Sequence, residues 1–321
     1  MPLEFPKADD LRIVRSLCHF LFDSHQQRAS VKSVTTWLGE TAEELFGREW
    51  RRTRTYHYTS ASYEFGLISK PDSHVFNLTK LGRTLVRCNP QLATPDEPLN
   101  KKEKKIFVKI LPNCDAVSRL LALYMPSGQP PKSLEDFVEC GQPVRMVRST
   151  SDSFLLISAN QQKHEIDRTE KGTFAWTLHN WLRCLELVDD VYEENSASYL
   201  FQDRTVRIFY PIRIGRLSVK ELRELLIAEG RKRSDFISGF FIPELLATVC
   251  ATRGIPKVEF LKTLVDLNDE DPINFHLEMM SKLRGDPRGP AYYKYLNFPE
   301  VRGVRRSHVC ISPNILRIEK S

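Results

Sequence analysis

Residues 50–87 decide the fold of this chain, and they read WRRTRTYHYTSASYEFGLISKPDSHVFNLTKLGRTLVR. Near the centre, the run Phe65–Ile68 places a glycine before two apolar residues. A short polar segment follows, in which Pro71 and Asp72 are residue types that favour a turn. Residues 75–78 then alternate between apolar and polar side chains, as a short half-buried strand does. This order predicts a two-stranded hairpin whose tip lies near Pro71 and Asp72.

The residues on both sides of the hairpin have helical features. Thr79 is a favourable N-cap for a following helix that contains Leu81 and Leu85. Before the hairpin, Trp50, Thr53, His57 and Ala61 can share one face of a helix. Residues 52–58 also alternate like a strand, and they are rich in Thr and Tyr, which favour strands. We expect a helix there because the hairpin that follows requires one.

A helix, a hairpin and a capped helix in this order resemble the winged helix of bacterial transcriptional regulators. The resemblance is carried by the G-L-I step, the polar turn, the F-x-L-T strand end and the L-G-x-x-L run after it. It implies that the helix before the hairpin is a recognition helix, which lies in the major groove of DNA. The implied partner is therefore double-stranded DNA.

Basic and hydroxyl-bearing side chains are concentrated at this recognition-helix position. Arginine can pair bidentately with guanine, while Ser, Thr and Tyr can hydrogen-bond to phosphates or base edges. The residues expected to enter the groove are Arg51, Arg52, Arg54 and Tyr58, and those expected on the wing are Lys70 and His74. The alternative is that the basic cluster is an ordinary solvated face of a helix.

Length and composition are those of a packed protein of several domains. The chain has 321 residues, of which 41% are hydrophobic, and this allows two or three domains. No apolar run is long enough to span a membrane, and the N-terminus lacks the form of a secretory signal. The seven cysteines include no C-x-x-C pair, which argues against a structural zinc site. Scattered thiols in an odd number fit a reducing cytoplasm, so we expect a cytoplasmic protein without disulfides, metal or cofactor. The net charge of +6 permits an anionic partner.

The expected fold class is mainly α with small β-hairpins (α+β), arranged as tandem winged-helix-like domains. The clearest boundary is the proline-rich run 89–100, which cannot be helical. The expected domains are residues 1–88, a winged helix; residues 89–100, a linker; residues 101–215, a second winged-helix-like domain with insertions; and residues 216–321, a third helical domain with a basic and aromatic C-terminal segment.

Helical spacing, caps and apolar runs predict most other elements. The expected helices are 11–21 after Asp9 or Asp10, 30–39 with a stop at Gly39, 41–46, 174–185 after a capping box at Asp167 and Glu170, a helix from Ser218 with a stop at Gly230, and 256–267. The expected strands are 154–157, 199–201, 205–210 and 304–311.

The middle segment repeats the order of helix, apolar pair and hairpin, but its helix differs in character. It carries Trp176 and Trp181, and only His179, Asn180 and Arg183 are polar residues suited to DNA. An exposed face of this kind suits a protein partner, because large apolar patches usually mark interaction sites.

The C-terminal segment offers a second basic cluster. Arg302, Arg305 and Arg306 follow a run rich in tyrosine, and basic residues interleaved with aromatics can clamp a nucleic-acid backbone. The alternative is that the aromatic residues fill the core of this domain. The run Arg231–Arg233 likewise has two interpretations, since it can bind phosphate or complement the dipole of the helix before it.

The sequence contains no Gly-rich phosphate loop, no H-E-x-x-H and no G-x-S-x-G. The carboxylates closest to a nuclease pattern are Asp152, Glu165 and Asp167, but no E-x-K follows them. We therefore expect a DNA-binding protein without enzymatic activity, either a regulator or a targeting subunit of a bacterial DNA-processing or defence complex. The alternatives are a protein–protein adaptor that assembles through winged-helix faces, and an enzyme such as a nuclease.

Overall fold

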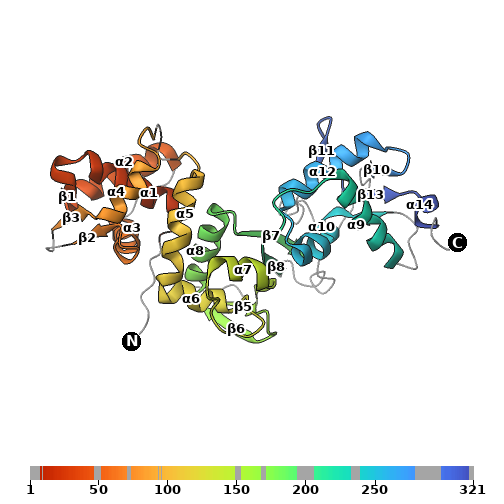
Figure 1. Ribbon diagram of the computed structural model, residues 1–321, viewed down its shortest axis with the longest axis horizontal. Helices are drawn as coiled ribbons and strands as arrows, with labels where there is room; N and C mark the ends of the chain where they lie inside the picture. Colours follow the sequence, from red (N-terminus) through yellow and green to blue (C-terminus); the bar gives the residue numbers. More distant parts are fainter. Residues whose placement is uncertain are drawn as a thin grey trace. The chain divides into compact units, whose positions relative to one another are not determined.

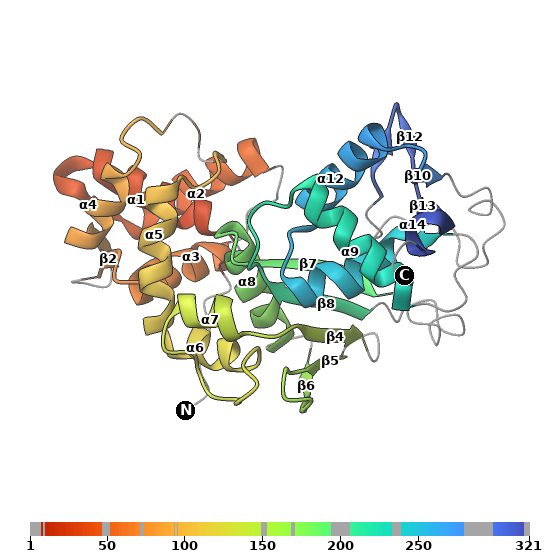
Figure 2. The ribbon, with the colours of Figure 1, turned by 45° about the vertical axis from the view of Figure 1, so that its right-hand side comes forward.

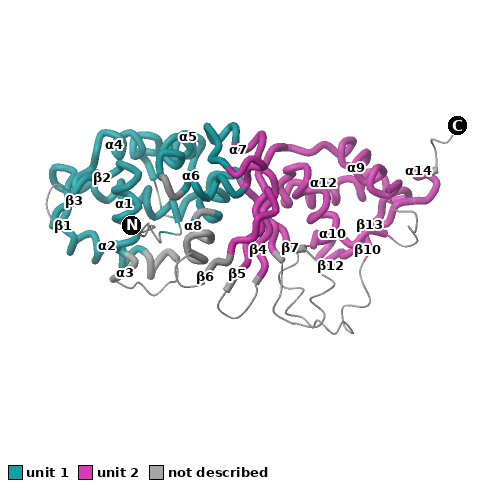
Figure 3. Tube along the Cα trace, turned by 90° about the horizontal axis from the view of Figure 1, so that it is seen from below, with its two compact units in different colours: residues 1–123, 129–136, 167–187 teal, residues 124–128, 137–166, 188–321 magenta. Residues whose placement is uncertain are grey.

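The computed structural model describes residues 8, 10–46, 52–70, 74–92, 94, 96–148, 153–167, 171–193, 206–232, 239–278 and 298–317. Within these residues the chain is an α+β protein, rich in helix and with small antiparallel sheets (Figure 1). It divides into two compact units, the first made of residues 1–123, 129–136 and 167–187 and the second of residues 124–128, 137–166 and 188–321 (Figure 3). Among the described helices, none has both the length and the apolar character that a membrane crossing needs.

The first unit begins with helices arranged around a small sheet. Its elements are α1 (Leu11–Asp23), β1 (Arg28–Ser30), α2 (Val31–Phe46), α3 (Arg52–Glu64), β2 (Ile68–Ser69), β3 (Val75–Leu78) and α4 (Lys80–Arg87). The strands form one antiparallel sheet in the order β1-β3-β2. Asp10 caps α1, since its side chain accepts a hydrogen bond from the Arg12 amide.

The hairpin expected between two helices is confirmed. Ile68 of β2 lies opposite Leu78 of β3, and helices α3 and α4 flank the pair. Thr79 caps α4, with its Oγ1 accepting a hydrogen bond of 3.1 Å from the Gly82 amide. The strand alternative for residues 52–58 is wrong, because burial of one side of α3 outweighs the weak helix propensity of Thr and Tyr. The tip near Pro71 and Asp72 lies outside the described residues.

Helices α5 (Lys101–Ile110), α6 (Asp115–Ala122) and α8 (Lys171–Cys184) complete the first unit, with a 3₁₀ turn at Leu111–Asn113. Trp181 of α8 is fully buried in this unit. Its ring lies 5.2 Å from that of Phe65 between centroids, and its Nε1 donates a hydrogen bond of 2.6 Å to the Ala8 carbonyl. The apolar surface expected around Trp181 is therefore covered by the unit's own residues, and the Trp176 side chain lies outside the described ones.

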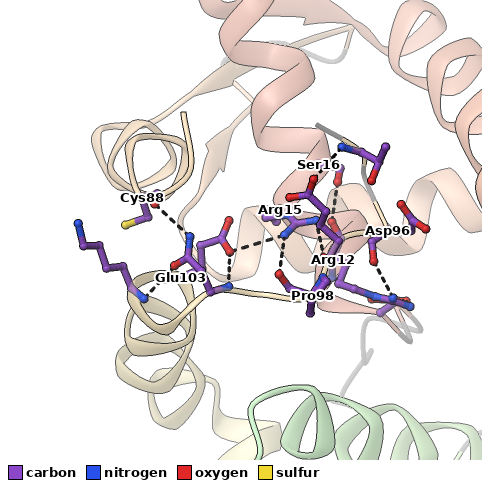
Figure 4. A network of polar contacts seen from close by, with 12 residues as sticks. Arg12, Arg15, Ser16, Cys88, Asp96, Pro98 and Glu103 are labelled. Carbon is purple, nitrogen blue, oxygen red and sulfur yellow. Dashed lines mark hydrogen bonds and ion pairs between the residues drawn. The ribbon is translucent and has the colours of Figure 1, made fainter. Parts of the chain in front are cut away.

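A buried ion pair joins α1 to α5 in the first unit (Figure 4). The side chains of Arg15 and Glu103 are both fully buried, with Nη1 3.6 Å from Oε2. Arg15 Nη2 also donates a hydrogen bond of 2.9 Å to the Glu97 carbonyl, and Glu103 Oε2 accepts one of 2.7 Å from the Asn100 amide. The run expected as a linker, 89–100, thus lies within the first unit and contributes backbone atoms to this network.

The second unit contains a five-stranded sheet and a helical part (Figure 2). The sheet has the order β6-β5-β4-β8-β7 and is made of β4 (Val144–Arg148), β5 (Ser153–Ile157), β6 (Lys163–Asp167), β7 (Val188–Glu193) and β8 (Val206–Pro211). The strands expected at 154–157 and 205–210 correspond to β5 and β8. Strands β7 and β8 are antiparallel neighbours, but they belong to this larger sheet rather than to an isolated hairpin. Helix α7 (Leu134–Cys140) has residues in both units.

The helical part of the second unit surrounds an apolar core that includes Phe240, Phe260 and Phe275. Its elements are α9 (Val219–Lys232), β9 (Phe240–Phe241), α10 (Ile242–Leu245), a π-helical turn (Leu246–Cys250), α11 (Ala251–Arg253), α12 (Lys257–Glu270), β10 (Phe275–Glu278), β11 (Glu300–Val301), β12 (Val304–Arg305), β13 (His308–Ile311) and α14 (Pro313–Arg317). Strands β10, β13 and β9 form a second small sheet in that order.

A cluster of charged side chains fixes the start of α12 against strands β7 and β8. Asp189 Oδ2 accepts a hydrogen bond of 2.8 Å from the Lys257 amide, so this carboxylate caps the helix from a distant strand. The neighbouring Asp190 is almost fully buried, and it accepts a hydrogen bond of 2.6 Å from Arg207 Nε. Lys257 Nζ completes the cluster by donating a hydrogen bond of 2.8 Å to the Asp190 carbonyl.

Two expected helix stops are wrong, because both glycines lie inside helices. Helix α2 continues through Gly39 and includes the separate helix expected at 41–46. Helix α9 continues through Gly230, where a Cβ would lie 2.8 Å from Leu316 Cδ2 of α14. A glycine inside a helix costs about 1 kcal/mol relative to alanine, which does not end a helix that packing stabilises. The strand expected at 199–201 and residue Glu170 of the expected capping box lie outside the described residues.

The buried pair predicts a large effect of one substitution in the first unit. Glu103→Ala leaves the Arg15 charge buried without its carboxylate, and we expect it to lower the free energy of unfolding by about 3–5 kcal/mol. All four tryptophans belong to segments of the first unit, so tryptophan fluorescence during urea unfolding follows this unit. The control is Lys104→Ala, which breaks a pair with the exposed Glu186 and should cost about 1 kcal/mol or less. Equal effects of the two substitutions would contradict the assigned role of Arg15 and Glu103.

Candidate nucleic-acid interface

Helix α3 has one buried side and one exposed side. Tyr58, Ala61 and Phe65 are buried, whereas Tyr56 is 61% exposed and Tyr63 is 57% exposed. The two exposed tyrosines are seven residues apart, which is about two helical turns, so both lie on the same side of α3. The exposed side therefore presents two aromatic rings with hydroxyl groups.

A groove of about 330 Å³ lies beside these tyrosines. It is bounded by α2, by the exposed side of α3 and by the hairpin β2–β3. Its lining residues are Val31, Thr35, Thr55, Tyr56, Thr59, Ser60, Tyr63, Lys70 and Phe76. The groove thus joins apolar walls to hydroxyl groups and one lysine, a composition that can contact both the bases and the phosphates of a nucleic acid.

The hairpin contributes a cation to the edge of this groove. Lys70 follows β2 and is exposed, with its Nζ 5.9 Å from the centroid of the Phe76 ring. His74 precedes β3 and is also exposed, and its carbonyl accepts a hydrogen bond of 2.9 Å from the Val31 amide. This backbone contact ties the turn end of the hairpin to the first residue of α2, so two of the walls of the groove are held together.

Close packing at the end of α3 fixes the angle between this helix and the hairpin. Gly66 has a φ of 67°, in the left-handed region that glycine adopts readily. Thr79 Oγ1 donates to the Gly66 and Leu67 carbonyls at 2.7 and 2.9 Å. At Gly82 a Cβ would lie 2.6 Å from Leu78 Cδ1, so the first turn of α4 lies directly against the hairpin.

One residue predicted to enter the DNA groove has to be corrected. Tyr58 is only 2% exposed, because it lies on the side of α3 that also buries Ala61 and Phe65. Its ring is part of the core of the first unit and cannot reach a nucleic acid in this fold. The spacing of the tyrosines carried the necessary signal: Tyr58 is seven residues before Phe65, while Tyr56 is seven residues before Tyr63.

The arginines predicted for the groove lie at the start of α3. Arg52 and Arg54 are in its first turn, and their side chains lie outside the described residues, as does the whole of Arg51.

The predicted C-terminal cluster belongs to the second unit. Arg302 and Arg305 are exposed on the hairpin β11–β12, where Arg302 has a φ of 52° in the turn. Arg306 is half-buried, and its amide donates a hydrogen bond of 2.9 Å to the Pro299 carbonyl. Two of the three arginines are therefore available to a partner of the second unit.

The carboxylates considered for a nuclease are only partly described. Glu165 and Asp167 belong to β6, which is an edge strand of the five-stranded sheet. Their side chains and all of Asp152 lie outside the described residues.

No protein family, curated protein or solved structure matches this chain.

The two sides of α3 predict opposite results for two tyrosine substitutions. Tyr58→Ala removes a buried aromatic ring and should lower the free energy of unfolding of the first unit by about 3–5 kcal/mol. Tyr56→Ala changes an exposed position and should alter it by about 0.5 kcal/mol or less. Urea unfolding followed by tryptophan fluorescence measures both values. A larger loss for Tyr56→Ala than for Tyr58→Ala would mean that α3 is rotated relative to the structure described.

Proposed function

We propose that the first unit binds double-stranded DNA as a winged helix, with α3 as the recognition helix and the hairpin β2–β3 as the wing. The observation that carries the proposal is the groove in which Tyr56 and Tyr63 of α3 face solvent beside Lys70 of the hairpin. The exposed side of a helix next to a hairpin is the surface that such a domain would turn toward DNA.

The order of the elements supports this proposal. Helix α2 is followed by α3 after a short connection, and α3 is followed at once by the hairpin. In helix-turn-helix proteins the second helix of such a pair lies in the major groove, with its N-terminal residues contacting base edges. In this chain the N-terminal residues of α3 are Arg52, Thr53 and Arg54.

The side chains around the groove suit the chemistry of duplex DNA. Tyrosine and serine hydroxyls donate hydrogen bonds to phosphate oxygens, and lysine adds a positive charge. Tyr56, Tyr63 and Lys70 can supply such contacts along one side of the unit, and Ser60 lies between the two tyrosines on α3. Arginine, the residue type at positions 52 and 54 in the first turn of α3, can pair with guanine.

The proposed biological role is that of a regulator or a targeting subunit of a bacterial DNA-processing or defence complex. In this role the unit selects or holds DNA, and the chemistry is carried out elsewhere. The exposed Arg302 and Arg305 would give the second unit a further contact with the phosphate backbone.

The alternative is an adaptor that binds protein through the same surface. It has some support, because exposed tyrosines are also common in protein interfaces. The sequence also suggested an apolar protein-binding face around Trp181. That argument for an adaptor is weaker, since Trp181 is buried within the first unit. Salt separates the two functions, because binding to phosphates falls steeply as salt rises, whereas an apolar protein interface is much less sensitive.

The DNA proposal is tested by measuring duplex affinity at two or more salt concentrations. We expect Lys70→Ala and Arg52→Ala to weaken binding and, for each lost phosphate contact, to flatten the salt slope by about one unit. The matched control is Lys262→Ala, which removes an exposed lysine on α12 of the second unit. Affinity that is unchanged in both Lys70→Ala and Arg52→Ala, in protein with normal unfolding, would reject this surface as the DNA reader.

The tyrosines allow the form of the nucleic acid to be tested. If the tyrosine hydroxyls contact duplex phosphates, Tyr56→Phe and Tyr63→Phe should each lower the affinity for duplex DNA nearly as much as the alanine substitutions do. The expected loss is roughly tenfold for one hydrogen bond to a charged group. If the rings stack on unpaired bases, phenylalanine should retain binding and only alanine should weaken it. If phenylalanine retains binding and the protein prefers single strands, the partner is single-stranded nucleic acid and not duplex DNA.

A further inference from the structure

The small sheet of the second unit has a buried face and an exposed face. On the buried face, Phe275 and Leu277 of β10 and Val309 and Ile311 of β13 pack into the apolar core. The residues between them point to the other face because side chains alternate along a strand. These residues are His276 and Glu278 on β10 and His308 and Cys310 on β13.

The register of the two strands brings these four residues together. In the antiparallel pair β10–β13, His276 lies directly opposite Cys310, and Glu278 lies directly opposite His308. Opposite side chains in such a pair have Cβ atoms about 4.5–5.5 Å apart. Two imidazoles, one thiol and one carboxylate therefore share a small area of the exposed face.

Three of these side chains already meet at their donor atoms. One ligand atom each from His276, Glu278 and Cys310 lies within 4.8 Å of the other two. His276 Nε2 is 3.0 Å from Glu278 Oε1, and the side chains of these two residues are 46% and 54% exposed. The ligands of a tetrahedral zinc ion, at bond lengths of about 2.0–2.3 Å, lie about 3.3–3.8 Å from one another. The His276–Glu278 pair, at 3.0 Å, is already near such a spacing.

We propose that His276, Glu278 and Cys310 form a binding site for a zinc-type divalent metal ion on the exposed face of the β10–β13 pair. Nitrogen, oxygen and sulfur donors in one set suit Zn²⁺, which accepts all three. This site is independent of the proposed DNA-binding surface, which belongs to the first unit.

The surroundings of the three residues support a site with one further position. His308 is the remaining ligand type on this face, and its Nδ1 lies 3.0 Å from Ser307 Oγ, so its Nε2 is the nitrogen left to approach a metal. Its ring is 5.3 Å from that of Phe241 on β9. The fourth ligand is therefore either His308 after rotation or a water molecule on the solvent side, as in zinc sites with three protein ligands.

The backbone makes room for the cysteine. At Gly239, with a φ of 103°, a Cβ would lie 2.7 Å from Cys310 Sγ.

A bound metal would join β10 to β13 through side chains as well as backbone. Strand β13 is the central strand of the sheet, and α14 follows it. Because a ligand that binds only the folded state stabilises it, the metal should strengthen this sheet in particular.

The test uses the purified full-length chain, treated with chelator, dialysed and then titrated with Zn²⁺ and with Co²⁺. We expect one metal ion per chain, and a sulfur-to-cobalt charge-transfer band in the near ultraviolet. Cys310→Ser should abolish that band and weaken zinc binding by about tenfold or more, and His276→Ala should weaken it similarly. The control is Cys140→Ser, which removes an exposed cysteine of the same unit outside the site and should keep both band and affinity.

Hydrogen exchange gives a second readout that depends on position. On addition of Zn²⁺, amides of β10 and β13 should become more protected, while those of α1 and α5 in the first unit should not change. Glu278→Gln provides a variant at an exposed side chain if Cys310→Ser fails to fold, and it should weaken zinc binding while leaving the far-ultraviolet circular dichroism unchanged. The proposal is overturned if the wild-type chain binds no zinc, if the cobalt complex lacks the sulfur band, or if Cys310→Ser or Glu278→Gln binds zinc as the wild type does.

Discussion

The buried pair of Arg15 and Glu103 is the constraint on which the first unit depends. Two full charges without solvent contact are stable only when each is compensated, and here the pair also orders the backbone around it. Burial lowers the pKa of Arg15, and the opposite charge of Glu103 acts against this shift. Because Arg15 also binds the Glu97 carbonyl, the proline-containing run before α5 is held against α1. The small sheet and its helices are thereby joined to α5 in one compact unit.

The proposed interface depends on which side of α3 this unit buries. Phe65, at the junction of α3 and the hairpin, lies against the rings of Phe107 and Trp181. These contacts orient α3 so that Tyr58 points into the core and Tyr56 and Tyr63 point out. Recognition in this proposal therefore relies on tyrosine hydroxyls and Lys70 as much as on arginines, and core packing determines which residues a partner can reach.

In the second unit, charged residues have two different uses. Asp189, Asp190, Arg207 and Lys257 are largely buried and satisfy one another, so they fix the start of α12 against β7 and β8. His276, Glu278 and Cys310 also lie close together, on the solvent side of the small sheet. Their donor atoms lie within 4.8 Å of one another, and this spacing is the basis of the proposed metal site.

The sequence by itself determined the local elements near residues 50–87, because caps, turns and alternation are properties of neighbouring residues. Thr79 as a cap and the strand at 75–78 needed no information from the rest of the chain. Only the tertiary structure decided that Tyr58 is buried, that Gly230 stays inside a helix, and that His276 lies opposite Cys310. Each of these depends on contacts between residues far apart in the chain, which are set by packing and strand register. Local propensity and residue spacing do not reveal such contacts.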